Sequence, residues 1–457
     1  MSIAERYEPS THEPFAVTAE AARWIEELRD EDIPAAAYER AKHVLLDWLG
    51  CSIAGAREPL VGILLEELGG EMQGACTLIA SGQRARLHDA ALINGSVAHA
   101  LDYDDVNRQL HGHPTACIAP AVMALGEFIG ANGNDLLTAF IAGTEVACSI
   151  GGMCEEGHYE VGFHATGTLG TFGAAAAAAK LMKLDADKTA MALAIAASQA
   201  AGLKANFGTM TKPLHAGKAA MNGLLAARLA ARGFTASDTA IEGAHGFGQA
   251  EVPGFEPREI RPEASAPYEV ENMLYKYHAS CFLTHSTLNA IRDMRAKHSF
   301  GLGDVEAATL KVRTTHASVC CIPEPKSGLE IKFSIVHLAA MGLDGVDTSA
   351  LETYSDNNAN DPRFVEARNR IRLDLREEMD RSQAVVSVTL KDGRELTGED
   401  NVGVPASDTS EQWEKLSAKF ISLATPVIGE DRTSDLLQRI GALENEADIS
   451  TLMKAAG

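Results

Sequence analysis

Residues 135–154 read DLLTAFIAGTEVACSIGGMC, and this stretch decides the fold class of the chain. Its apolar side chains recur at three- and four-residue spacing, which is the periodicity of a buried helix. The segments AAYERAKHVLLDWLGCSIAG (residues 36–55) and KTAMALAIAASQAAG (residues 188–202) repeat the pattern. Alanine is the best helix former, and small side chains let neighbouring helices approach closely. The first two thirds of the sequence therefore predict a large all-α domain.

The pattern changes in the last third of the chain. ATLKVRTTHASV (residues 308–319) and AVVSVTLKDGREL (residues 384–396) alternate β-branched and polar residues, as strands do. The pair Asp392 and Gly393 is typical of a hairpin turn. KFSIVHLAAMGLDG (residues 332–345) predicts a helix between the strands. This region therefore predicts a smaller α+β domain.

The segments after Ser407, such as EQWEKLSAKFISLATPVI, are helical again. They either form a third small domain or return to the helical body, and we favour the return. We therefore predict a mainly α protein, with a helical domain over 1–265 and 405–457 and an α+β domain over 266–404. No βαβ alternation and no GxGxxG motif after a strand are found, so a nucleotide-binding sheet is not expected.

The overall charge excludes two classes of partner. The 457 residues contain 40 Lys and Arg against 63 Asp and Glu, a net charge of −23, and 46% are hydrophobic. These hydrophobic and charged fractions are those of an ordinary globular protein. Nucleic acids and anionic membrane surfaces both require a basic face, so neither is an expected partner.

The cysteine spacing and the apolar segments indicate the cellular compartment in which the protein is expected. Eight cysteines show no CxxC spacing, which disfavours a disulfide scaffold or a zinc site. The first fifteen residues contain acids and prolines in place of a basic and then apolar signal peptide. The alanine run after Phe172 is short and ends at Lys180, so it does not span a bilayer. We therefore expect a reduced, cytoplasmic protein.

Four segments concentrate polar residues within otherwise apolar sequence. Burying a polar group without a partner costs about 1–3 kcal/mol, so four such clusters are better explained by one convergent site than by four accidents. The segments are NGSVAHALDYDDVNRQLHGHP (residues 94–114), GHYEVGFHATGTLGTFG (157–173), NFGTMTKPLHAGKAAMNG (206–223) and KYHASCFLTHS (276–286).

Structural roles are open for several of these residues. His99 is followed by Asp102 at helical spacing, so the two could form a simple contact in the core. Asp104 and Asp105 could cap a neighbouring helix.

Other residues of these segments have competing interpretations. His111 and His113 could bind a metal, but no HxxxH or HExxH motif and no closed ligand set follows, so we expect no metal. His215 could lie on the surface, and Cys281 could be a small buried hydrophobe. GTLGTFG (residues 167–173) matches neither a P-loop nor a Rossmann turn, and close helix packing explains it better than a phosphate cradle.

The order of the four segments resembles the MmgE/PrpD family. NGSVAHALDYDD…HGHP, GFHATGTLGTFGAAAAAAKL, TKPLHAGKAAMNG and K-x4-C-x3-HS follow one another at family-like spacing, from about residue 15 to beyond 400. The family includes 2-methylcitrate dehydratase, cis-aconitate decarboxylase and iminodisuccinate epimerase. The resemblance implies a helical domain built from both chain ends, an inserted α+β lid, a homodimer, and a site between the domains that needs no cofactor.

The resemblance implies functional residues wherever this chain matches a motif of the family. Asp102 matches the first aspartate of D-[FY]-D-D, His113 matches the histidine of H-P, and His164 matches that of G-[WF]-H. Lys212 matches the lysine of T-K-P, and Lys276 opens the fourth segment. These five residues are therefore the expected centre of the site.

Two positions depart from the family pattern. Cys281 stands where the cis-aconitate decarboxylases have histidine, which argues against decarboxylation. Val106 stands where Thr or Ser is common, which points to an unusual substrate. Cys281 and the segment NFGTMTKP look more like the epimerase branch.

The shared chemistry of the family is the making or breaking of a C–H bond beside a carboxylate. It needs a base near one carbon and an acid near a leaving group, and histidine suits both roles near neutral pH. His113 and His164 are the expected proton-transfer residues, with Asp102 orienting or assisting them.

The expected substrate is a small di- or tricarboxylate. Lys212 and Lys276 would bind its carboxylates as point charges, with His215 and Cys281 as further contacts. Dehydration of a 2-methylcitrate-like substrate is the first hypothesis, and epimerisation of an iminodisuccinate-like substrate is the alternative. Decarboxylation, a non-catalytic binding protein and a metal-dependent hydrolase are less favoured.

Overall fold

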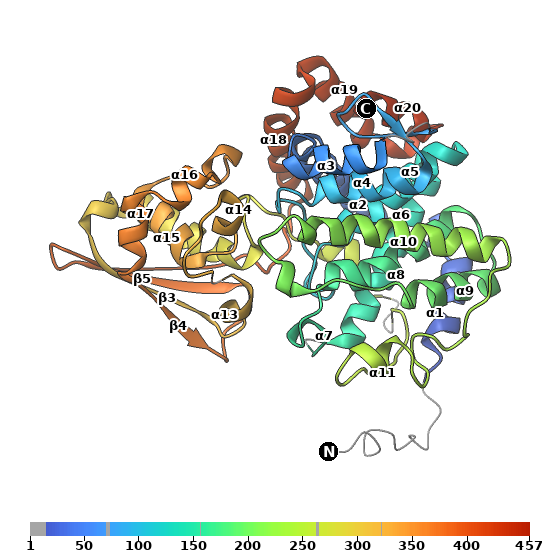
Figure 1. Ribbon diagram of the computed structural model, residues 1–457, viewed down its shortest axis with the longest axis horizontal. Helices are drawn as coiled ribbons and strands as arrows, with labels where there is room; N and C mark the ends of the chain where they lie inside the picture. Colours follow the sequence, from blue (N-terminus) through green and yellow to red (C-terminus); the bar gives the residue numbers. More distant parts are fainter. Residues whose placement is uncertain (1–14, 70–73, 156, 262–264, 321) are drawn as a thin grey trace.

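The computed structural model has two lobes, a large helical one and a smaller one that carries a β-sheet (Figure 1). The predicted fold class, mainly α with a smaller α+β part, is confirmed. The N-terminal stretch, in which no signal peptide was expected, lies outside the described residues, apart from Phe15. The structure describes residues 15–69, 74–155, 157–261, 265–320 and 322–457.

The helical lobe is formed by segments from both ends of the chain. Two short strands, β1 (Cys76–Thr77) and β2 (Arg84–Ala85), pair at its edge. Its N-terminal helices are α1 (Val17–Glu27), α2 (Ala35–Gly55), α3 (Pro59–Gly69), α4 (Leu87–Ala98), α5 (Pro114–Ile129), α6 (Gly133–Cys154), α7 (Gly157–Glu160), α8 (Ala165–Leu181), α9 (Ala186–Ala197), α10 (Thr211–Ala231) and α11 (Phe247–Glu251).

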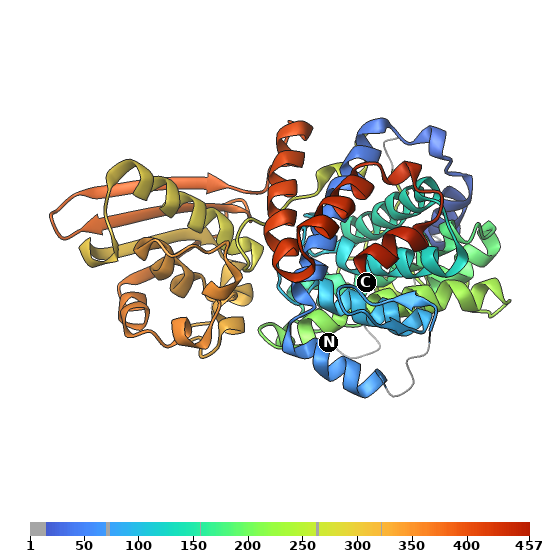
Figure 2. The same ribbon diagram turned by 90° about the horizontal axis from the view of Figure 1, so that it is seen from above.

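The C-terminal helices α18 (Thr409–Ile428), α19 (Glu430–Gly441) and α20 (Ile449–Ala456) pack against the helical lobe, α18 on α2 and α20 on α5. They are drawn in red in Figures 1 and 2 and lie beside the blue N-terminal helices. The tail therefore returns to the helical body.

Helices α6 and α8 form the centre of the helical lobe. In α8 every residue except Lys180 is buried, and its alanines and glycines contact α5, α6 and α10. The glycine-rich start of α8 is thus a packing surface, because a Cβ at Gly170 would lie 2.6 Å from Cys117 Sγ. Helix α6 is long and apolar enough to cross a membrane, but 94% of its most apolar window is buried inside the protein, as in a core helix.

Helices α4 and α10 meet at glycines, which gives a stability prediction. A Cβ on Gly217 would lie 2.1 Å from the Leu92 carbonyl oxygen and 2.3 Å from Ser96 Oγ, so Gly217→Ala must push two backbones apart. We expect it to lower the free energy of unfolding by about 1–3 kcal/mol, the usual cost of overpacking. Gly62→Ala is the matched control, because nothing lies within 4 Å of its Cβ position on the exposed side of α3.

Thermal unfolding of Gly217→Ala and Gly62→Ala tests the predicted changes in stability. Gly62→Ala is expected to raise stability by up to about 1 kcal/mol, since alanine is the better helix former. Equal unfolding midpoints for Gly217→Ala and the unaltered chain would contradict the close approach of α4 and α10.

The smaller lobe is a four-stranded sheet with helices packed on it. The strand order is β4-β3-β5-β6, and β3 pairs antiparallel with β5 and parallel with β4. Gly393, at φ +87°, forms the predicted turn between β5 and β6. The strands are β3 (Val305–Arg313), β4 (Ile371–Arg376), β5 (Gln383–Leu390) and β6 (Glu395–Asn401), and the helices are α12 (His285–His298), α13 (His316–Val319), α14 (Gly328–Ile331), α15 (Ile335–Asp344), α16 (Asp356–Ala359) and α17 (Pro362–Arg368).

The smaller lobe contains one parallel strand pair that the sequence did not indicate. The parallel pair of β3 and β4 is joined by a helical crossover through α13 to α17, so the chain does contain one βαβ connection. Strand β4 is short and partly exposed, and a long helical crossover separates it from β3, so no regular βαβ alternation is visible in the sequence. The residues from His316 to Val319, expected to continue the first strand, form a helical turn instead.

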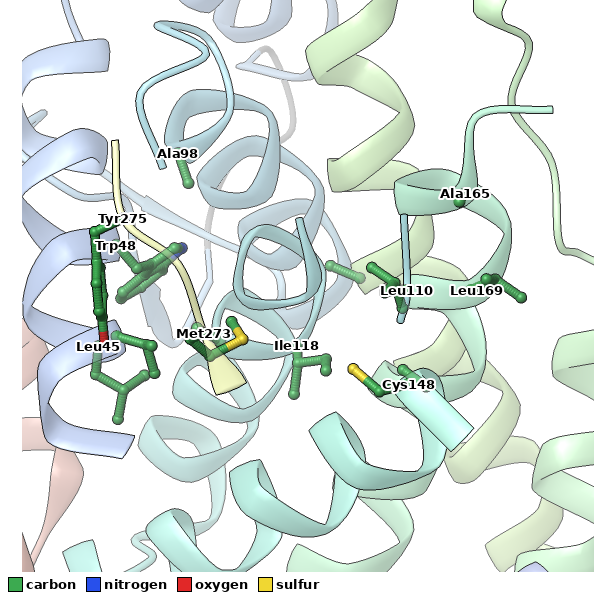
Figure 3. Close-up of a cluster of buried hydrophobic side chains, with 14 of the residues drawn as sticks. Leu45, Trp48, Ala98, Leu110, Ile118, Cys148, Ala165, Leu169, Met273 and Tyr275 are labelled. Atoms are coloured by element: carbon green, nitrogen blue, oxygen red, sulfur yellow. The ribbon is translucent and has the colours of Figure 1, made fainter. Parts of the chain in front are cut away.

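The segment that leads into the smaller lobe lies on the helical core. Met273 and Tyr275 lie beside Leu45 and Trp48 of α2 (Figure 3). Burial of these large side chains fixes the path of the backbone on either side of them, because well-packed side chains leave few alternative positions. The next residue, Lys276, is thereby held in the junction between the lobes.

Candidate active site

The four polar segments meet at one cavity, as the sequence predicted for a convergent site. The cavity has a volume of about 180 Å³, whereas a single water needs only about 10–15 Å³ on such a measure. It lies where the two lobes meet. The expected site residues that line it are Asp102, His113, His164, Lys212, Lys276 and Cys281, and only His215 of that set does not.

The loop between α4 and α5 forms the inner wall of the cavity. Asp102 at φ +51° and His111 at φ +57° are in the left-handed region, which is uncommon for residues other than glycine. The loop is fixed from outside, because Val106 and Leu274 exchange two backbone hydrogen bonds of 2.8 Å. The left-handed backbone of Asp102 and His111 is strained. Backbone strain of this kind persists only where the surrounding structure enforces it, and it is frequent at functional sites.

Asp102 is shared by two lysines. Its Oδ1 accepts hydrogen bonds from Lys212 Nζ at 2.9 Å and from Lys276 Nζ at 2.7 Å. Lys276 also donates to the Asp102 carbonyl oxygen at 2.9 Å and is fully buried. Burial raises the pKa of Asp102, but Lys212 and Lys276 lower it by more, so the net pKa lies well below its ordinary value. Asp102 is therefore ionised, and Lys276 holds it in position.

Asp104 connects two imidazole rings. His99 donates from Nδ1 to both carboxylate oxygens at 3.0 Å, and His113 Nδ1 lies 3.1 Å from Oδ2. Burial raises the pKa of Asp104, while His99 and His113 lower it by more, and the net pKa is well below 3.8. The carboxylate thus fixes a proton on Nδ1 of His99. Its proximity to Nδ1 of His113 favours a proton there too, which leaves Nε2 of His113, 3.6 Å from Asp102 Oδ1, as the nitrogen that can take up a proton.

Burial keeps both rings uncharged. It lowers the pKa of His99 to about 3 and also lowers that of His113, although Asp104 opposes the effect in each case. His99 Nε2 accepts a hydrogen bond from Lys212 Nζ at 2.9 Å. Lys212 thereby uses two of its three donors on His99 and Asp102, and one donor remains for a ligand.

Asp105 differs from its neighbour. Burial, followed by repulsion from Asp104 and Asp47, raises the pKa of Asp105 well above 3.8, so this acid is protonated. Its Oδ2 accepts a hydrogen bond from Thr115 Oγ1 at 2.9 Å. Two adjacent acids therefore have opposite charge states.

The structure corrects two structural interpretations of these residues. Helix α4 ends at Ala98, and the His99 ring hydrogen-bonds the carboxylate of Asp104 rather than that of Asp102, so the expected side-chain contact was wrong, although His99 is a buried and hydrogen-bonded histidine. Neither Asp104 nor Asp105 caps a helix, because α5 begins after His113 and both carboxyls bind side chains.

His164 lines the opposite part of the cavity and has a second histidine behind it. His164 Nδ1 and His215 Nδ1 lie 3.0 Å apart, so one of them carries the shared proton. Burial, followed by the charge of Lys212, lowers the pKa of His164 well below 6.5. His215 is partly exposed and reaches the cavity only through His164.

Cys281 is part of the cavity wall. A hydrogen bond with Cys320 is the largest effect on this thiol and lowers its pKa below 9.0. Only 7% of Cys281 is exposed. The position that the resemblance marks as a departure from the decarboxylases thus lies on the cavity wall.

Four of these side chains are close enough together to suggest a metal site. One ligand atom from each of His99, Asp102, Asp104 and His113 lies within 4.8 Å of the others. Two ammonium groups are bound to Asp102 in the same space, and a divalent cation there would face direct repulsion from both. This group of side chains, with two ammonium groups among them, is therefore better suited to an anionic ligand than to a metal ion.

A cationic group on the wall of the cavity formed by the smaller lobe was not predicted from the sequence. Arg381 follows β4 and reaches the cavity from the smaller lobe, where Nη1 lies 2.6 Å from His111 Nδ1. It comes from a polar stretch without a motif, so no local signal marks it. His99 and Asp104 were visible in the sequence, but their pairing was not.

The fold and the cavity define an enzyme that acts on small carboxylates. The chain belongs to the MmgE/PrpD family, since the models of the MmgE/PrpD N-terminal and C-terminal domains match residues 19–260 and 278–443. It is 28% identical to a cis-aconitate decarboxylase of Aspergillus terreus over 96% of this chain and 95% of that protein. It is also 28% identical to the cis-aconitate decarboxylase of Homo sapiens, over 96% and 94% of the two chains.

Proposed function

We propose that this enzyme dehydrates a small hydroxy-tricarboxylate of the 2-methylcitrate type. The observation that carries the proposal is the pair of uncharged histidines, His113 and His164, placed on one cavity with the free donor of Lys212. Elimination of water needs one group that removes a proton and another that supplies one to the leaving hydroxyl.

The proposed roles follow from the hydrogen bonds of each ring. His113 Nε2 takes the proton from the carbon beside a carboxylate, and Asp104 stabilises the imidazolium that forms. The C–H electron pair becomes the new C=C bond, and the C–O bond breaks. His164 gives its Nε2 proton to the leaving hydroxyl, which departs as water. His215 passes its Nδ1 proton to His164 Nδ1, so His164 stays neutral, and the partly exposed ring of His215 takes a proton from solvent at Nε2. Lys212 stabilises the negative charge that develops on the carboxylate.

The proposed role of His164 as a proton donor requires one tautomer of its ring. If His215 Nδ1–H donates to His164 Nδ1, then the proton of His164 is on Nε2. A ring held in this tautomer presents an N–H group rather than a lone pair to the cavity. The two rings of the site would then have complementary roles, one basic and one acidic.

Decarboxylation of cis-aconitate is the second candidate function. It is favoured by the similarity to cis-aconitate decarboxylases along nearly their whole length. It is disfavoured by Cys281, which replaces the histidine of those enzymes on the cavity wall.

NMR in D2O tests the proposal. Purified enzyme is incubated with 2-methylcitrate, citrate, cis-aconitate or iminodisuccinate in parallel, with His164→Asn as a control for contaminating enzymes. Alkene signals from 2-methylcitrate or citrate support dehydration, and itaconate from cis-aconitate would replace it with decarboxylation. Deuterium uptake without elimination would indicate an epimerase, and no change with any of the four would overturn the proposal.

The pH profile of kcat/KM gives an independent prediction. Burial lowers the pKa of His113, so this base stays uncharged until the pH falls below 6.5. A reaction that needs the neutral ring loses activity as the pH falls through that lowered pKa. We expect an acidic limb below pH 6.5 and no loss between pH 6.5 and 8. An acidic limb centred at or above pH 6.5 would contradict the uncharged state of His113.

A further inference from the structure

Arg381 is a cation at the cavity that has no carboxylate partner within the described residues. The guanidinium contacts the uncharged ring of His111 and the aromatic face of Tyr159, whose ring centroid lies 4.7 Å from Arg381 Cζ. The inner lysines, in contrast, are both paired with Asp102. The other arginines on the cavity wall have acidic partners, Arg108 with Asp380 at 2.7 Å and Arg313 with Glu377 at 3.6 Å.

The surroundings of Arg381 orient the guanidinium without neutralising it. Burial, followed by the charges of Arg381 and Arg108, lowers the pKa of His111 to about 3, so this ring is neutral and accepts at Nδ1. Tyr159 supports the plane of the guanidinium from one side. An arginine has five N–H donors in a flat fork, so fixing one of them leaves an edge that matches a carboxylate.

We propose that Arg381 is a specificity residue that binds a second carboxylate of the substrate through the edge of its guanidinium that His111 and Tyr159 leave free. The inference rests on the proposed function, because it takes the substrate to be a polycarboxylate. Lys212 holds the carboxylate beside the reacting carbon, and Arg381 holds a remote one from the opposite lobe. A substrate with one carboxylate would reach only one of these groups.

Because Arg381 lies on one lobe and Lys212 on the other, substrate binding by both would depend on how the two lobes are arranged. Arg381 belongs to the lobe of the β-sheet, whereas His111 and Tyr159 belong to the helical lobe. A carboxylate bound by Arg381 and a second one bound by Lys212 would bridge the two lobes. Binding energy from the remote carboxylate would thus help to hold the cavity closed around the reacting carbon.

The test is a binding cycle with unreactive probes. Tricarballylate has three carboxylates and no hydroxyl to lose, glutarate lacks its central carboxylate, and methylsuccinate lacks a terminal one. Affinities of all three are measured by calorimetry for the unaltered enzyme and for Arg381→Gln. Charge-assisted hydrogen bonds support an expected preference of about 10- to 100-fold for tricarballylate over one of the shorter probes. This preference should vanish in Arg381→Gln.

Two further variants sharpen the cycle. Arg108→Gln also removes a guanidinium from the cavity wall, but one already bound to Asp380 and to the Gly403 carbonyl, so it should leave the preference intact. Arg381→Lys keeps the positive charge but lacks the planar, bidentate N–H donors of the guanidinium. It should therefore show only part of the preference that Arg381→Gln loses.

The outcomes separate the two proposals. An unchanged preference in Arg381→Gln would overturn the role of Arg381 and leave the proposed function standing. Failure of tricarballylate to bind the unaltered enzyme would overturn both, since the substrate class itself would be wrong. A lost preference in a folded Arg381→Gln variant, verified by its thermal unfolding, supports the inference even if the reaction proves not to be dehydration.

Discussion

Asp102→Asn is expected to abolish measurable turnover and to lower the free energy of unfolding by about 3–5 kcal/mol, the usual result of breaking a buried ion pair on one side. Asparagine also tolerates the left-handed backbone of this position, so the substitution tests charge rather than strain. Without the carboxylate, the ammonium groups of Lys212 and Lys276 lose their shared counter-ion. Lys212 then no longer has a fixed position at the cavity, and a misplacement of about 1 Å costs about 10²-fold in rate.

A double variant separates the two effects. In Asp102→Asn with Lys276→Met, the unpaired ammonium of Lys276 is replaced by an apolar chain of similar size. Removing both charges should restore part of the stability but none of the activity. Urea unfolding and kcat/KM are measured for the four members of the cycle. Strictly additive stability changes would contradict a direct pairing of Asp102 with Lys276.

Asp104→Asn is expected to lower kcat/KM by about 10²–10⁴-fold, in the range found when a general base or its orienting carboxylate is lost. The carboxylate keeps the proton of His113 on Nδ1 and stabilises the imidazolium formed during proton transfer. An amide can satisfy these roles only in part, because it carries no charge and offers donors as well as an acceptor.

Asp105→Asn is the matched control for Asp104→Asn. The two acids are adjacent and fully buried, but Asp105 is already protonated, so the neutral amide resembles its native state. We expect its kcat/KM to stay within about 10-fold of the unaltered enzyme, because no charge is lost near the reacting groups. Comparable losses of activity in both variants would contradict the assignment of opposite charge states.

Local patterns in the sequence were sufficient to predict most of the fold. The alanine-rich helices and the turn at Gly393 depend on periodicity and backbone preference, which short segments carry. Strand β4 was missed because its pairing with β3 depends on a distant part of the chain and not on its own residues. The homodimer, the cytoplasmic location and the exact limits of the two domains stay predictions.

The membership of the site was easier to predict than its electrostatics. Polar residues in apolar sequence marked the segments that hold Asp102, His113, His164 and Lys212, and these side chains do share one cavity. The opposite charge states of Asp104 and Asp105 depend on which neighbours fold against each, so adjacency in sequence gives no clue to them.

The position of α18 has a consequence for how the protein is made. Lys419 of α18 donates to the Tyr103 carbonyl at 2.7 Å and pairs with Asp47 at 2.7 Å, directly beside the strained Asp102. A chain still on the ribosome lacks this support until α18 has emerged, while the earlier helices can already pack. Chains that end prematurely before Lys419 would therefore leave translation with a formed helical core and no organised reaction centre.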